Sequence, residues 1–275
     1  TPRELTHDEI LAIIQRFGKA AGVVKKAGFS GVQIHGAHGY LVSQFLSPHH
    51  NIRTDKWGGS AENRRRFVLE VYKEMRKNVG SDFPISIKLN SADFQRGGFT
   101  EEESLGLITA LSDAGMDLIE ISGGTYEAPV MTGLMKESTR QREAYFLEFA
   151  EKARKICKCP LAVTGGFRTA EGMAQAITSG AVDFVGIARS MALETDIPNK
   201  VLNGITPKYT VKPIKTGIPM IDNMGLMEVS WYSLQLKRIG RGEQPKPNEN
   251  ALWAFLKIML HQSRITKRLP RKLRA

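Results

Sequence analysis

Residues 84–122 read PISIKLNSADFQRGGFTEEESLGLITALSDAGMDLIEIS, and this stretch decides the fold class. It begins with Pro84–Leu89, a short β-rich run. Thr100 and Glu103 then form a capping-box pattern, which predicts the start of a helix that ends at Gly115. A second β-rich run completes the stretch. We therefore expect a strand–helix–strand unit with parallel strands, because parallel neighbours need a crossover connection.

The same alternation continues on both sides of this unit. The β-rich runs are Gly31–His35, Pro84–Leu89, Asp117–Ser122, Pro160–Thr164 and Phe184–Ile187. Helices are expected from the capping pair Thr6 and Glu9 to Gly28, from Ser60, from Thr100 to Gly115, at about Glu143–Ile156 and at Thr169–Thr178. Alternation of this kind predicts an α/β fold with a parallel sheet, and the mostly apolar strands favour a sheet covered on both faces.

The pattern breaks after Asp196, where prolines and glycines mark an irregular stretch. One or two helices are expected within 220–239, and a last amphipathic helix is expected at 251–268. The sequence thus predicts two domains, one at 1–200 and a helical extension at 201–275.

Composition excludes several classes of protein. Of the 275 residues, 41% are hydrophobic and 24% are charged, which is typical of a globular chain. No apolar run approaches the ~20 residues that a transmembrane helix needs, and residues 1–5 carry no apolar signal core. Cys157 and Cys159 are too few and too close for a disulfide framework, so we expect a reduced, intracellular chain in the cytoplasm.

The net charge of +11 is concentrated at one end. Seven Lys and Arg residues and no acidic residue lie from Lys257 onward, so the first 256 residues carry only +4. This distribution argues against a nucleic-acid-binding domain. For the basic tail itself, a solvated helix end, an anionic membrane surface, nucleic acid and a partner protein stay open.

The densest polar cluster follows the first expected strand, at His35-Gly-Ala-His38-Gly-Tyr40. Sites in α/β folds gather at the carboxyl ends of strands. Neutral imidazoles can donate hydrogen bonds to a carbonyl oxygen, and a phenol can deliver a proton. The competing interpretations are ordinary loop histidines and a metal site, for which no third ligand lies nearby.

Three further features are candidates. Lys88 lies within an apolar strand and needs either a ligand or a salt bridge, for instance to Glu120. The last two strands end in Gly165-Gly166 and in Ala188-Arg189, which suits phosphate binding by backbone N–H groups and a guanidinium. The polar loop 47–64 is either functional or a self-packed surface loop in which Arg53 pairs with Asp55.

Together these motifs resemble the old yellow enzyme family of FMN-dependent ene-reductases. The resemblance rests on His35–Leu41, on Gln44–Pro48, on Asn51 and Arg53–Asp55, on Trp57–Arg64, on Lys88–Asp93 and on the two small-residue strand ends, and it covers roughly residues 1–200. It implies an eight-stranded β/α barrel, of which this chain carries the last five units plus a helical extension. Three preceding strand–helix units are missing, so we expect a fragment of a longer protein or a chain that needs a partner or forms a homo-oligomer.

The resemblance also implies roles for individual residues. His35 and His38 would bind the oxygen of an activated alkene, and Tyr40 would donate the proton. FMN, reduced by NADPH or NADH, would give the hydride. Lys88 would lie against the flavin. The flavin's phosphate contacts would be Gly165, Gly166, Ala188 and Arg189. The four-cysteine iron–sulfur cluster of one subgroup is absent from this sequence.

Two alternatives to an active ene-reductase stay open. One is a truncated, non-catalytic paralogue or fragment that cannot hold FMN alone. The other is a different flavin or phosphate barrel enzyme, which would carry a catalytic Cys or Ser in place of the His-x-x-His-x-Tyr motif.

Overall fold

The computed structural model describes residues 3–125, 145–205, 211–222 and 227–268, which form two compact units. The first comprises Thr1–Phe167 with Gly172–Gly186, and the second comprises Arg168–Glu171 with Ile187–Ala275. The boundary expected at residue 200 stays a prediction.

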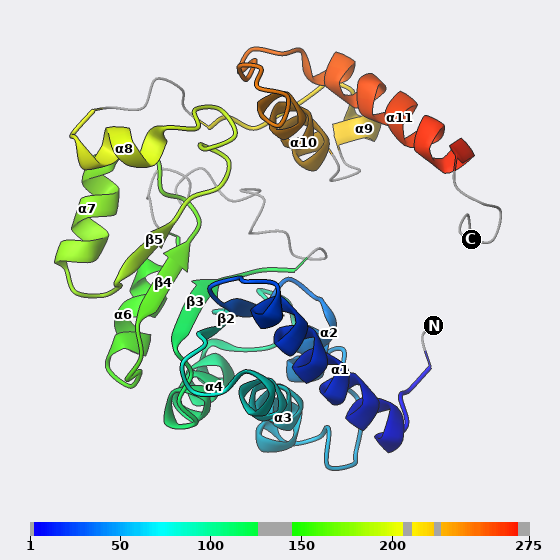
Figure 1. The fold of residues 1–275 in the computed structure, drawn as a ribbon, viewed down its shortest axis with the longest axis vertical. Helices are drawn as coiled ribbons and strands as arrows, with labels where there is room; N and C mark the ends of the chain where they lie inside the picture. Colours follow the sequence, from blue (N-terminus) through cyan, green and yellow to red (C-terminus); the bar gives the residue numbers. More distant parts are fainter. Residues whose placement is uncertain (1–2, 126–144, 206–210, 223–226, 269–275) are drawn as a thin grey trace. The chain divides into compact units, whose positions relative to one another are not determined.

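The described residues of the first unit contain a parallel sheet of five strands, in the order β1-β2-β3-β4-β5 (Figure 1). The strands are β1 (Val32–Gly36), β2 (Ile85–Asn90), β3 (Leu118–Ser122), β4 (Leu161–Thr164) and β5 (Phe184–Gly186). All five expected strands are confirmed, and each strand end lies within one residue of its expected position. The chain therefore forms part of a β/α barrel.

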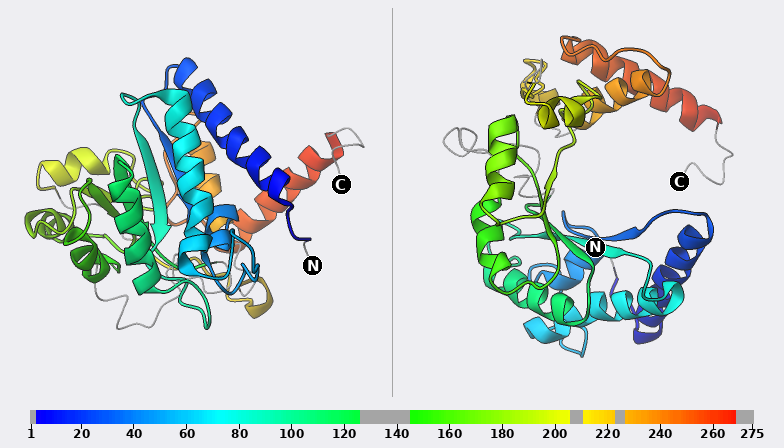
Figure 2. Two further views of the ribbon diagram at one scale, coloured as in Figure 1. Left: turned by 90° about the horizontal axis from the view of Figure 1, so that it is seen from below. Right: turned by 60° about the vertical axis from the view of Figure 1, so that its left-hand side comes forward.

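One helix, α1, precedes the first strand, and the other described helices of this part of the chain lie between successive strands, as the alternation requires (Figures 1 and 2). They are α1 (His7–Lys26), α2 (Leu41–Leu46), α3 (Ala61–Val79), α4 (Glu101–Asp113), α6 (Leu147–Arg154) and α7 (Ala170–Thr178). Both expected capping boxes are present, Thr6 with Glu9 and Thr100 with Glu103. The sequence missed α2, which has only six residues and no side-chain cap. Residues 143 and 144 of the expected fourth helix lie outside the described residues.

The two faces of the sheet differ in chemistry. Strand residues on the helix-covered face are fully buried, as Ile34, Ile87 and Ile119 show with at most 1% of their surface exposed. The residues between them, such as His35 and Glu120, are exposed or half-buried. The expectation of a sheet covered on both faces fits β4, where Leu161, Ala162 and Val163 are all buried, but not β1, β2 and β3, where side chains on one face are half-buried or exposed. We call the polar side the inner face.

The strand register sets the candidate residues in one row. His35 of β1 is the partner of Lys88 of β2, and Lys88 is the partner of Glu120 of β3. Adjacent parallel strands lie about 4.8 Å apart, so the three side chains emerge as neighbours on the inner face.

The second unit is helical. Its elements are α8 (Ile197–Leu202), α9 (Pro219–Asp222), α10 (Met227–Ile239) and α11 (Ala251–Arg268). Its buried cluster contains Ala192, Leu193, Trp231, Tyr232 and Ala254. The expected helices within 220–239 and at 251–268 are confirmed, whereas α8 lies in a stretch that the sequence analysis left irregular. Residues 269–275 of the basic tail lie outside the described residues.

Candidate active site

The turn after β1 brings three aromatic side chains together. The ring centroids of His35 and His38 lie 5.4 Å apart, and those of His35 and Tyr40 lie 4.8 Å apart. His38 and Gly39 both have positive φ, at 63° and 81°, which tightens the turn between the strand and α2. Tyr40 is the N-cap residue of α2 and is 47% exposed. The structure therefore gathers these three predicted site residues around His35.

Neighbouring strands hold His38 in place. Its backbone N–H donates to Asn90 Oδ1 at 3.2 Å, and its ring Nε2 lies 3.0 Å from Ser122 Oγ. Asn90 is itself fixed, because its Nδ2 donates to Asp93 Oδ1 at 2.9 Å. Asn90 and Asp93 lie within the segment Lys88–Asp93 that carries part of the family resemblance, but the sequence analysis assigned them no role.

Both imidazoles are held in the neutral form at neutral pH. Burial lowers the pKa of His38 to about 4, and the positive charge of Lys88 adds to this effect. Burial and Lys88 also lower the pKa of His35. A neutral imidazole retains one N–H, which can donate to a ligand oxygen.

Lys88 takes part in an ion pair on the inner face. Its Nζ lies 2.8 Å from Glu120 Oε1, and the two side chains are 19% and 16% exposed. The salt bridge that the sequence offered as the alternative to a ligand is thus present. The pair lies in the same row as His35, so it also belongs to the surroundings of the candidate site.

The four predicted phosphate contacts fall in different units. Gly165 and Gly166 follow β4 in the first unit, with φ of 130° and 87°. A side chain at Gly166 would meet the ring of Tyr145 at 2.9 Å. Ala188 and Arg189 belong to the second unit, where Arg189 pairs with Glu228 at 2.9 Å. Their joint role in holding a phosphate stays a prediction.

The polar loop 47–64 packs on its own chain. Arg53 pairs with Asp55 and also donates to the carbonyl of Leu5 at 2.8 Å. Asn51 is buried and donates to the carbonyls of Phe45 and Trp57. These contacts favour the structural interpretation that the sequence left open for this loop.

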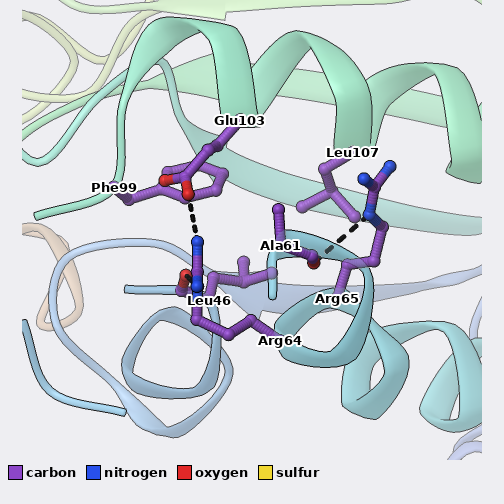
Figure 3. A pocket seen from close by; sticks show the side chains of 7 residues that line it. All are labelled: Leu46, Ala61, Arg64, Arg65, Phe99, Glu103 and Leu107. Atoms are coloured by element: carbon purple, nitrogen blue, oxygen red, sulfur yellow. Dashed lines mark hydrogen bonds and ion pairs between the residues drawn. The ribbon is translucent and has the colours of Figure 1, made fainter. Parts of the chain in front are cut away.

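Arg64 links the end of this loop to α2 and α4. It donates to the carbonyl of Leu46 at 3.0 Å and forms an ion pair with Glu103. Figure 3 shows this pair in a small cavity whose lining is Leu46, Ala61, Arg64, Arg65, Phe99, Glu103 and Leu107. Arg65 is bonded to the carbonyls of Ala61 and Gly106. Both guanidinium groups therefore serve the packing of α2, α3 and α4.

The two cysteines lie away from the strand ends that carry the candidate site. They precede β4, and their Sγ atoms are 3.4 Å apart as free thiols. Across the described part of the chain, no three His, Cys, Asp or Glu side chains are arranged to hold a metal ion. Within the same residues, no helix has both the length and the apolar composition to cross a membrane.

Comparisons with known proteins agree with this arrangement. The sequence model of the NADH:flavin oxidoreductase / NADH oxidase family matches residues 1–208. The NADH-dependent flavin oxidoreductase iliE of Hypocrea jecorina is 42% identical over 209 residues, which cover 73% of this chain and 51% of that protein. The chain spans between 31% and 54% of the length of the first curated relatives it matches.

Solved structures show the same likeness. The structure of 2-naphthoyl-CoA reductase with 2-naphthoyl-CoA has a TM-score of 0.68 and 35% identity, covering 74% of this chain and 30% of that one. The old yellow enzyme homologue from Zymomonas mobilis has a TM-score of 0.60 and 25% identity, covering 76% of this chain and 56% of that one.

Proposed function

Since the chain belongs to the NADH:flavin oxidoreductase / NADH oxidase family, that is, the old yellow enzyme family, we propose that the whole protein binds FMN and passes hydride from NADPH or NADH to an activated alkene. The observation that carries this proposal is the gathering of His35, His38 and Tyr40 beside Lys88 at the carboxyl ends of β1 and β2. The physiological substrate is proposed only as a class, a small alkene activated by a carbonyl or a similar electron-withdrawing group.

The donor set of the inner face suits a flavin. Lys88 Nζ has three N–H donors, and among the described residues it is bonded only to Glu120, which leaves donors for the flavin's acceptor edge. Gly165 and Gly166 have φ of 130° and 87°, conformations that side chains disfavour, and a chain without side chains at these positions can approach a phosphate closely. For Ala188 and Arg189, which belong to the second unit, the role of phosphate contact is proposed from the family resemblance alone. When bound, FMN supplies two-electron chemistry between the nicotinamide and the acceptor.

His35 and His38 would hold the acceptor by its oxygen. Both rings are neutral, so each can donate one hydrogen bond without placing a second positive charge beside Lys88. Donors fixed in advance stabilise the negative charge that develops on such an oxygen during reduction. The contact of His38 with Ser122 limits rotation of its ring.

Tyr40 would deliver the proton. Its ring packs at 4.8 Å from His35, and its 47% exposure leaves it accessible to a bound acceptor. A phenol can transfer a proton to carbon once charge has built up on the acceptor. The proton then goes to the α-carbon while the hydride goes to the β-carbon.

The test is to purify the full-length protein and record its visible spectrum. We expect a bound-flavin spectrum that is bleached by NADH or NADPH without oxygen and restored by a cyclic enone. Protein that stays colourless after FMN addition would instead support a non-catalytic paralogue. A flavin that is bleached but not restored by any enone would contradict the proposed acceptor class.

A further inference from the structure

Glu120 joins four neighbouring strands through its carboxylate. Its Oε1 accepts from Lys88 Nζ of β2 at 2.8 Å and from Thr164 Oγ1 of β4 at 2.6 Å. Its Oε2 accepts from Gln33 Nε2 of β1 at 2.9 Å. A carboxylate bound from three sides cannot rotate freely, so its negative charge has a fixed place on the inner face.

The carboxylate is ionised in this setting. Burial alone would raise the pKa of Glu120, but the hydrogen bonds from Lys88 and Thr164 and the charge of Lys88 hold it below its ordinary value. The inner face therefore carries a fixed pair of opposite charges next to the two histidines.

The two charges act on the histidines in opposite directions. Lys88 lowers the pKa of both His35 and His38, whereas Glu120 raises both. Glu120 thus weakens the effect of the ammonium on its neighbours. Any other group bound on the inner face within the same few ångströms would experience the same partial cancellation.

We propose that Glu120 is a positioning residue that holds Lys88 in place and offsets part of its positive charge, and so limits how strongly the site stabilises a bound anion. The inference rests on the proposed function where the bound group is FMN, whose reduced ring is the anion that Lys88 would stabilise. In that setting Glu120 keeps the flavin's reduction potential lower than Lys88 alone would make it.

The first experiment measures the midpoint potential of the holoenzyme. Glu120→Gln removes the charge but keeps the shape and one acceptor oxygen. We expect it to shift the ratio of reduced to oxidised flavin at a given potential about tenfold toward the reduced form, which corresponds to about 30 mV for a two-electron couple. Lys88→Met should shift the potential in the opposite direction. Glu151→Gln, an exposed site on α6 with the same change in charge, should leave it unchanged.

Removing one partner of a buried ion pair is destabilising, so a single variant can fail to fold. Two further variants allow the inference to be tested in that case. The double variant Lys88→Met/Glu120→Gln leaves no unpaired charge, and its potential should lie between those of the two single variants. Glu120→Asp keeps the charge and should return the potential most of the way to the wild-type value.

A second readout needs no flavin. The charged and titratable groups that bear on the His35 ring are Lys88 from β2 and Glu120 from β3. The same two groups bear on the His38 ring, together with His35 from β1, while Thr164 of β4 is neutral. NMR titration of the His35 ring in the protein without FMN should show a lower pKa in Glu120→Gln and a higher pKa in Lys88→Met. This measurement tests the inference even if the wild-type protein fails to bind FMN, which would count against the proposed function alone.

The inference is overturned by either of two results. One is a Glu120→Gln protein whose His35 titration and flavin potential match the wild type. The other is a shift in the same direction as that of Lys88→Met, which would mean that Glu120 supports the ammonium without offsetting it.

Discussion

His38 adopts a backbone conformation that few residues other than glycine use. Its φ of 63° is strained for a side chain of this size, and such strain persists only where surrounding contacts demand it. Asn90 binds its backbone and Ser122 binds its ring, each from a different strand. The direction of this imidazole is therefore imposed by β2 and β3 and not by the turn in which it lies.

Tyr40→Phe separates the two half-reactions. Without its hydroxyl the residue cannot donate a proton, so we expect alkene reduction to slow by about 10² or more. Reduction of the flavin by NADH or NADPH needs no proton from this residue and should stay close to the wild-type rate. Stopped-flow absorbance measures both steps, and equal losses in both would contradict the role of Tyr40.

His35→Ala and His38→Ala should each weaken the binding of a phenolic ligand by about tenfold, because each change removes a hydrogen bond to the ligand oxygen. Spectral titration of the flavin with a simple phenol measures this affinity. If both variants bind the phenol as tightly as the wild type, neither imidazole contacts the acceptor oxygen.

The charge state of His38 also links stability to pH. Its pKa of about 4 in the folded chain lies below the ordinary value of 6.5, so between these values the unfolded chain binds a proton that the folded chain does not. The free energy of unfolding should therefore fall as pH drops from about 6.5 to about 4. Urea titrations of wild type and His38→Gln across this window should show a flatter dependence in the variant. An unchanged slope would mean that His38 is not held neutral by the fold.

At the scale of elements, the loop between α2 and α3 is fastened at several points. Trp57 is 2% exposed and donates to His7 Nδ1 at 3.0 Å, which ties the loop to the start of α1. Arg53 reaches the carbonyl of Leu5, and Arg64 reaches Glu103 of α4. The loop that carries much of the family motif thus positions helices around the site.

Arg64→Ala should destabilise the first unit by about 3 kcal/mol, because it removes the cationic partner of the Glu103 carboxylate and the side-chain donor to the carbonyls of Leu46 and Gly59. Arg66→Ala is the matched control, since Arg66 is exposed on the same helix, and it should cost less than about 1 kcal/mol. Urea denaturation measures both values. If both variants lose the same free energy of unfolding, the buried ion pair of Arg64 stabilises the protein no more than the exposed Arg66 does.

At the scale of the whole molecule, each unit has its own buried core. The first unit buries the helix-facing side of its sheet, as Ile87 and Ile119 show, and the second unit buries Trp231 with Tyr232. Separate cores allow separate unfolding, because local stability follows local burial.

Trp231→Ala should cost about 3 to 5 kcal/mol in the second unit, since it removes a fully buried ring. Hydrogen exchange followed by mass spectrometry should show faster exchange in α10 and α11, with protection of β1, β2 and β3 retained. Equal loss of protection in both units would mean that they unfold as one.

Much of the architecture follows from local signals. The strands and most helices were predictable because side-chain periodicity, the capping pairs and the helix-ending glycines act over a few residues. The short helices α2 and α8 were missed because six residues are too few to show a period. The sequence offered the pairing of Lys88 with Glu120 as one of two alternatives, but it could not decide between them or place His35 beside Lys88, since strand register depends on how the whole sheet packs.

The sequence by itself determined the parallel β/α order and the residues available for chemistry, because both depend on patterns of residues that are close together along the chain. Only the tertiary structure decided how those residues act together. Glu120 meets Gln33, Lys88 and Thr164 across separations of 87, 32 and 44 residues, and no local pattern specifies such contacts. These contacts form because the parallel pairing of the strands sets residues that are distant in sequence side by side on the sheet. Opposite charges and hydrogen-bond donors and acceptors at neighbouring positions then pair with one another.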